Sequence, residues 1–219
     1  MRGTLRGSCL AGVALLTSAC AAAHPAQKFR PEGSSQNQGS DTAATSAPSR
    51  TGAHGLAWPP FGSNLHVTMP GWLPAKRSQI PAVVADKNFA LALLYAEYRG
   101  NRDHRWQAYT SPRIRSALAR QLSAPDVTTE SFTGTIRFSH LSAFPDSSIK
   151  GAIDVAQCFD NSHSTNTSLQ TGQPVSDKTP ANQHYYLTTN VLKQSSDGKW
   201  RVVSIYPAIY YPQARECKP

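Results

Sequence analysis

The chain has 219 residues and a formal net charge of +9, which comes from 22 Lys and Arg against 13 Asp and Glu. Charged residues make up only 16% of the chain and form no Lys/Arg-rich run, so the composition argues against a nucleic-acid-binding protein. The length allows one folded domain with additional chain. No segment has the roughly 20 apolar residues of a membrane-spanning helix.

The chain begins with the pattern of a secretory signal peptide, which we assign to residues 1–19. Two arginines precede a short apolar run at residues 9–16, and small residues follow it. The sequence TSAC at residues 17–20 is similar to a bacterial lipobox, although Thr17 stands where leucine is usual. In such a box the cysteine becomes the first mature residue and carries a lipid. We therefore expect lipidation of Cys20 and an extracytoplasmic protein anchored to the cell membrane.

Two other outcomes of export stay open. The three alanines at residues 21–23 offer a second cleavage site, which would release a soluble secreted chain that starts at His24. An uncleaved signal that serves as a membrane anchor is the third outcome. Residues 20–56 are rich in Ser, Thr, Gly, Ala, Pro and Gln, which predicts a disordered tether after Cys20. A tether of this length would hold a domain tens of ångströms from a membrane, which favours lipidation over release.

Residues 57–219 are predicted to form a single domain, and its first half is helical. Apolar residues at helical spacing predict a helix over residues 83–99, with Val84, Leu91, Tyr95 and Tyr98 on one stripe. A short extended piece at residues 65–69 precedes this helix. Two further helical segments are expected at residues 103–109 and, after a Ser-Pro start, at residues 112–122.

The second half of the domain changes to a period of two, which predicts antiparallel strands. Polar residues 161–182 are expected to form a loop, and Asp197 and Gly198 a turn. Helices followed by antiparallel strands define an α+β fold. The expected strands are residues 132–141, 148–159, 184–193 and 200–206.

The cysteines agree with export. Cys9 is lost with the signal, and Cys20 is either lipidated or lost. Cys158 and Cys217 remain as a pair in an oxidising compartment, which predicts a disulfide that closes a loop of about 60 residues. Two free thiols are the alternative. Neither cysteine belongs to a C-x-x-C pair, so redox and zinc chemistry have no support.

An ordered set of features extends over about residues 58–217. It consists of the aromatic-rich first helix ending in Tyr95 and Tyr98, the Trp106/Tyr109 segment, the Ser111-Pro112 helix, VAQCFDN at residues 155–161, TGQPV at 171–175, DGKWRV at 197–202, and Cys217. This set resembles the exported nuclear transport factor 2-like domain proteins of actinobacteria, many of which are lipoproteins. The resemblance implies a curved sheet wrapped on helices as a cone with a pocket, and a Cys158–Cys217 disulfide. Secreted members of the family have no agreed activity, so it implies no reaction.

Catalytic signatures such as G-x-S-x-G, H-E-x-x-H, the P-loop and G-x-G-x-x-G are missing from the sequence. The seven histidines show no metal-ligand spacing, and we predict neither a metal nor a cofactor. His140, Gln157 and Tyr185 are expected to share the pocket face of the sheet, with His140 as the best candidate acid or base. Asp154 is out of phase with its apolar neighbours, so we expect it on the sheet surface, paired with Arg137.

These observations favour a non-catalytic envelope protein. We expect a lipid on Cys20 to hold it at the cytoplasmic membrane, and its domain to bind a protein or small molecule of unknown identity. A homodimer through the sheet face is a further expectation. The alternative is a pocket enzyme of isomerase or dehydratase type, or a soluble secreted protein. An open pocket where His140, Gln157 and Tyr185 meet a buried carboxylate would favour the enzyme, and a cone filled by Leu and aromatic side chains would exclude it.

Overall fold

The structure is a computed structural model, and it describes residues 61–69, 76–177 and 179–217. The predicted signal peptide, Cys20 and the tether lie outside the described residues, so their assignments stay predictions. Within the described residues, no helix combines the length and apolar character needed to cross a membrane.

The helices begin close to where the sequence predicts them, because their start signals are local. α1 spans Ile80–Tyr98 after the short turn η1 (Arg77–Gln79), and η2 spans Arg105–Tyr109. α2 spans Pro112–Leu122, and the Ser111 hydroxyl accepts a hydrogen bond from the backbone amide of Ile114 at 3.5 Å. Proline in the first turn is tolerated because its missing N–H would have no helical partner there. The five-residue helix α3, Pro125–Thr129, was not predicted.

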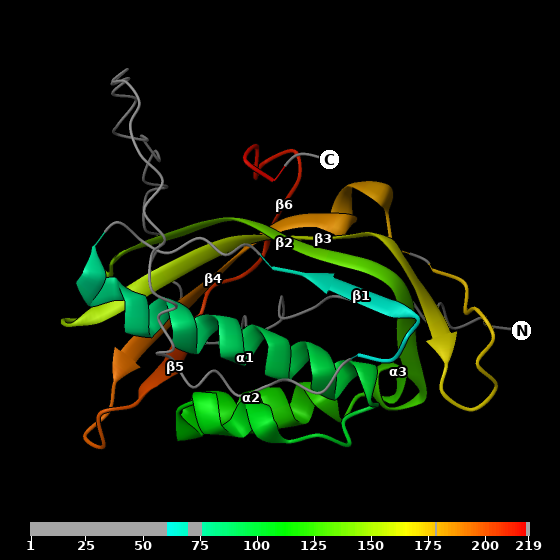
Figure 1. The fold of residues 1–219 in the computed structure, drawn as a ribbon, viewed down its shortest axis with the longest axis horizontal. Helices are drawn as coiled ribbons and strands as arrows, with labels where there is room; N and C mark the ends of the chain where they lie inside the picture. The colour runs from blue at the N-terminus through cyan, green and yellow to red at the C-terminus, as the bar shows by residue number, and fades with distance from the viewer. Residues whose placement is uncertain (1–60, 70–75, 178, 218–219) are drawn as a thin grey trace, which may run out of the picture. The chain divides into compact units, whose positions relative to one another are not determined.

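The second half, together with the extended piece near residue 65, forms an open, curved, mixed sheet, which confirms the α+β class (Figure 1). Its strand order is β1-β2-β3-β4-β5, and β6 pairs with β4. β1 runs parallel to β2, whereas the other neighbours are antiparallel, so the expected purely antiparallel sheet was wrong. The strands are β1 Leu65–Thr68, β2 Glu130–Pro145, β3 Ala152–Ser168, β4 Tyr185–Gln194, β5 Trp200–Ile205 and β6 Ile209–Tyr210.

β3 also continues to Ser168, well into the segment that the sequence predicts as a polar loop. This extension pairs with the start of β2, and the last pair is Glu130 opposite Ser168. The backbone groups of both strands are therefore hydrogen-bonded to each other. The polar side chains of this segment predict a loop, but a strand needs apolar residues only where one of its faces is buried.

α1 lies against one face of the sheet, with α2 on its far side (Figure 1). Because η2 and the sheet both pack against α1, its apolar residues do not form the single predicted stripe. Val84, Leu91, Tyr95 and Tyr98 are only half-buried. The residues of α1 that are buried instead are Ala82, Val83, Asp86, Phe89, Ala92, Leu93, Leu94 and Ala96.

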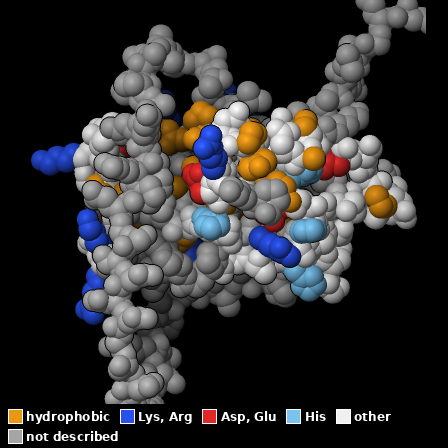
Figure 2. Space-filling view, turned by 90° about the horizontal axis from the view of Figure 1, so that it is seen from above, with side chains coloured by type: hydrophobic (Ala, Val, Ile, Leu, Met, Phe, Trp, Pro, Cys, Tyr) orange, Lys and Arg blue, Asp and Glu red, His pale blue; other side chains and the backbone are white. Residues whose placement is uncertain are grey.

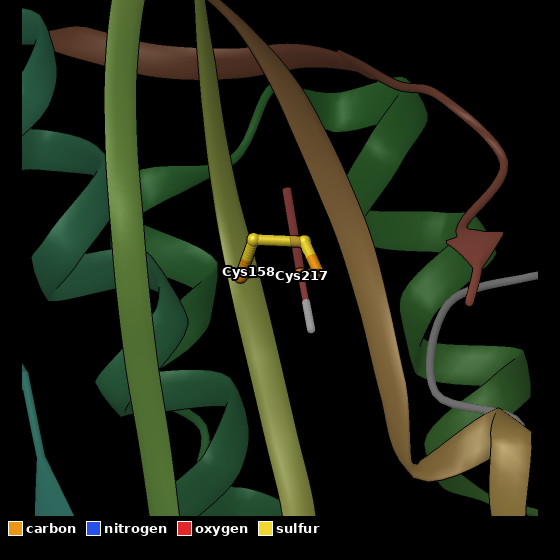
Figure 3. Close-up of a disulfide and its surroundings, with 2 residues drawn as sticks. All are labelled: Cys158 and Cys217. Atoms are coloured by element: carbon orange, nitrogen blue, oxygen red, sulfur yellow. A yellow bond between two sulfur atoms is a disulfide. The ribbon is translucent and has the colours of Figure 1, made fainter. Parts of the chain in front are cut away.

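The other face of the sheet, which we call the outer face, carries the predicted Cys158–Cys217 disulfide (Figure 3). Both cysteines are buried and pack with Ala214 and the half-buried Leu187. Cys158 is opposite in phase to Gln157 and Phe159, so the bond lies on the side away from α1. It therefore fixes the C-terminal segment to the outer face of β3.

Candidate functional site

A pocket lies between α1 and the facing side of the sheet, and we call it the α1 pocket. Its cavity volume is about 60 Å³, and it opens to solvent. A volume of this size encloses a few water molecules or part of a small organic molecule, so the rest of such a ligand would extend through the opening. Three parts of the chain line it: α1 with Phe89, Ala90, Leu93, Leu94 and Glu97; the sheet with Phe138, Gln157, Phe159, Tyr186, Thr188 and Asn190; and the segment after β5 with Tyr206 and Ala208.

Apolar and aromatic side chains form the walls of the α1 pocket. The ring centroids of Phe138 and Phe159 are 5.1 Å apart, and those of Phe159 and Tyr186 are 4.9 Å apart. Three neighbouring strands supply these rings, because residues paired in register on adjacent strands project to the same face. The pocket therefore has a continuous aromatic wall opposite Leu93 and Leu94 of α1.

A buried carboxyl group lies behind one end of the α1 pocket. Asp86 is completely buried, and it accepts hydrogen bonds from the side-chain amides of Asn190 at 2.7 Å and Gln157 at 3.3 Å. Burial raises the pKa of Asp86 to about 7, and the Asn190 hydrogen bond opposes that rise in part. Asp86 thus fixes the two amide side chains that line the pocket.

A second carboxyl group lines the α1 pocket itself. Glu97 follows Asp86 by eleven residues, which is about 16 Å along a helix axis. Glu97 is half-buried by its exposed surface, and partial burial in the pocket, with a smaller contribution from the charge of Asp126, raises its pKa to about 7. Burial and the nearby charge of Glu97 raise the pKa of the Tyr186 phenol, so this hydroxyl stays protonated. The two ends of the pocket therefore differ in chemistry, with amides at one and a carboxyl with a phenol at the other.

The structure places the three predicted pocket residues differently from one another. Gln157 is 2% exposed and lines the α1 pocket. His140 is exposed and lies at a bulge of β2 with a φ of 48°, so its side chain is outside the pocket. Tyr185 pairs with Asp160 on the outer face, and its neighbour Tyr186 lines the pocket instead. The expected meeting of all three residues is therefore not observed.

Sequence reasoning missed Asp86 and Glu97, the two carboxyl groups at the pocket. A usable signal was present, because both acids fall on the apolar, sheet-facing side of the helix with Phe89, Ala90 and Leu93. At 100° per residue, a separation of eleven residues returns to the same side of a helix.

Asp154 lies on the outer face as its phase predicts, but it is only 7% exposed and therefore not a surface carboxylate. The expected pair with Arg137 is not formed, because Arg137 lies opposite Asp160 in the strand register and Asp154 lies opposite Phe144. Burial and the neighbouring, hydrogen-bonded Asp146 raise the pKa of Asp154 to about 7. Tyr206 donates a hydrogen bond to Asp146 at 3.2 Å, so a tyrosine and two acids lie together at this edge.

The outer face also carries exposed histidines. Figure 2 views the molecule from the side away from α1, where histidine side chains gather. His66 and His163 flank Thr135 on adjacent strands in register, and both are exposed. Within the described residues, no three His, Cys, Asp or Glu side chains lie close enough together to hold a metal ion.

Comparisons with known proteins add little to this description. No family model matches the chain, and no curated protein matches it. A solved structure from Catenulispora acidiphila is similar with 13% sequence identity and a TM-score of 0.40, over 64% of this chain and 99% of that one. Such a TM-score is too low to establish a shared fold. The resemblance to nuclear transport factor 2-like proteins, including the cone shape, therefore stays a prediction.

Proposed function

We propose that this protein is an extracytoplasmic, lipid-anchored binding protein whose domain takes a small, mainly apolar molecule into the α1 pocket. The observation that carries the proposal is the lining of that pocket, where an aromatic wall meets a few polar groups from α1, β3 and β4. Binding sites for small molecules have this composition, because apolar surface supplies affinity and a few polar groups fix orientation.

The positions and hydrogen bonds of the polar groups favour binding over catalysis. Asp86, the most deeply buried acid, is held by two amides and lies behind the lining. His140, the best candidate acid or base from the sequence, lies outside the pocket. Glu97 supports the alternative of an isomerase-type enzyme, because a carboxyl group whose pKa is about 7 can both accept and donate a proton near neutral pH. A Glu97→Gln variant that binds ligand normally but abolishes turnover of it would favour the enzyme.

The binding proposal is tested with a variant whose pocket is filled. Benzyl alcohol at millimolar concentration is expected to raise the melting temperature of the wild type. Ala90→Phe adds a ring to the lining and is expected to abolish this rise. Ala85→Phe is the matched control, because Ala85 lies on the same helix outside the lining and should retain the response. If Ala90→Phe responds as strongly as the wild type, the ligand binds elsewhere and the proposal fails.

The anchoring proposal is supported by the lipobox-like sequence at residues 17–20 and by a disulfide, since such bonds persist outside the cytoplasm. Mass spectrometry of the mature N-terminus is expected to find a diacylglyceryl group on Cys20. A Cys20→Ser variant should then move from the membrane fraction into the medium. A free N-terminus at His24 in the wild type would instead establish a soluble secreted protein.

A further inference from the structure

The charge of the α1 pocket is one-sided. Among the described residues that line it, Glu97 is the only Asp, Glu, Lys, Arg or His. None of the ion pairs among the described residues involves Glu97. The pocket therefore presents a carboxyl group without a counterion from the described residues.

A second acid, Asp126, acts on this end of the pocket. Asp126 of α3 lies within electrostatic range of Glu97 and of Glu130 at the start of β2, and Asp177 acts on Glu130 in turn. The charge of Asp126 makes the electrostatic potential at Glu97 more negative, although the chain as a whole carries a net charge of +9. A ligand that places a positive charge here gains from both Glu97 and Asp126, whereas a carboxylate or phosphate is repelled.

The aromatic wall adds to the same preference. Glu97, Phe159 and Tyr186 all line the α1 pocket, and the ring centroids of Phe159 and Tyr186 lie 4.9 Å apart. Ammonium groups are attracted to the faces of such rings, more strongly when they are shielded from water. Beyond this end, Leu93, Leu94 and Phe138 provide apolar surface for the rest of a ligand.

We propose that the α1 pocket selects an amphipathic organic cation, an amine with a small apolar body, whose ammonium group pairs with Glu97 while the body packs against the aromatic wall. This inference rests on the proposed binding function and specifies its ligand class. It differs from an apolar site in general, because the same body without the charge should bind more weakly.

The test compares three ligands that share one ring: benzylamine, benzyl alcohol and benzoate, which at pH 7.5 are cationic, neutral and anionic. Isothermal titration of the mature wild-type protein is expected to show benzylamine binding at least about tenfold more tightly than benzyl alcohol, with no binding of benzoate. In Glu97→Gln, which keeps the shape of the side chain, the affinity for benzylamine should fall about tenfold and that for benzyl alcohol should stay the same. Glu130→Gln, outside the lining, is the matched control and should change either affinity by less than about twofold.

The possible outcomes separate the two proposals. Equal affinity of wild type for the amine and the alcohol contradicts cation selection but leaves a binding pocket. An amine preference that survives in Glu97→Gln contradicts the role of Glu97. Absence of binding by all three compounds contradicts both the binding function and this inference.

Discussion

Replacing both Cys158 and Cys217 with alanine is expected to lower the free energy of unfolding by about 4 kcal/mol. The two cysteines are 59 residues apart in the sequence, and in the chain-entropy description a loop of this length restricts the unfolded chain by about that amount. The bond also holds buried Ala214 and the C-terminal segment on the outer face of β3. A loss of 4 kcal/mol is a large share of the stability of a domain of this size.

The measurement is urea unfolding of the double variant and its parent, both in a Cys20→Ser background that removes the remaining mature thiol. Adding reductant to the parent should reproduce the effect of the double variant and leave the double variant unchanged. A difference below about 1 kcal/mol would contradict the structural role of the disulfide.

Raising the pH from 4 to 8 is expected to destabilise the protein by on the order of 4 kcal/mol through Asp86 alone. Burial places the pKa of Asp86 at about 7 in the folded state, above its ordinary value of 3.8. Well below pH 3.8 the group is protonated in both states, and its contribution to stability is fully present. As the pH rises, the unfolded chain ionises freely while the folded chain resists ionisation until about pH 7, so stability is lost across this window. Glu97 and Asp154, whose pKa values are also raised to about 7, act in the same direction.

Asp86→Asn isolates the contribution of this residue. Its neutral amide keeps an oxygen that accepts the Asn190 hydrogen bond, but it cannot ionise. Urea unfolding at pH 5 and pH 8 should show that the variant loses roughly 2 to 3 kcal/mol less than the wild type over this interval. Glu216→Gln replaces an exposed acid and should leave the wild-type dependence intact. An equal pH dependence in Asp86→Asn and the wild type would show that Asp86 ionises as freely in the folded state as in the unfolded one.

The helices and the disulfide could be predicted because their determinants are local or few. A serine cap before Pro112 and apolar residues at helical spacing mark α2 within its own segment. Export leaves only two cysteines to pair. Long-range pairing was out of reach, because nothing within Leu65–Thr68 specifies that it joins β2 in parallel. The polar half of β3 was missed for the same reason, since its strand conformation depends on β2.

The candidate site was predicted only in part, because each residue's direction depends on its context. A period of two assigns Tyr185 and Tyr186 to opposite faces, but only pairing with β3 decides which face is the pocket. The bulge at His140 is an irregularity that alternation cannot anticipate. Asp86 was overlooked because a buried carboxyl group is stable only with hydrogen-bond partners. Its partners, Asn190 and Gln157, are distant in the sequence and are brought to it only by the fold.

The most direct test of the binding pocket is a methyl NMR titration of the mature protein with benzylamine. We expect concentration-dependent shifts of the Leu93 and Leu94 methyl signals, which line the α1 pocket, and unchanged signals from Leu118 and Leu122, which are buried on α2. The same titration of Ala90→Phe should leave all four unchanged. Unperturbed Leu93 and Leu94 signals at millimolar ligand, or shifts confined to residues outside the lining, would contradict a ligand-binding role for this pocket.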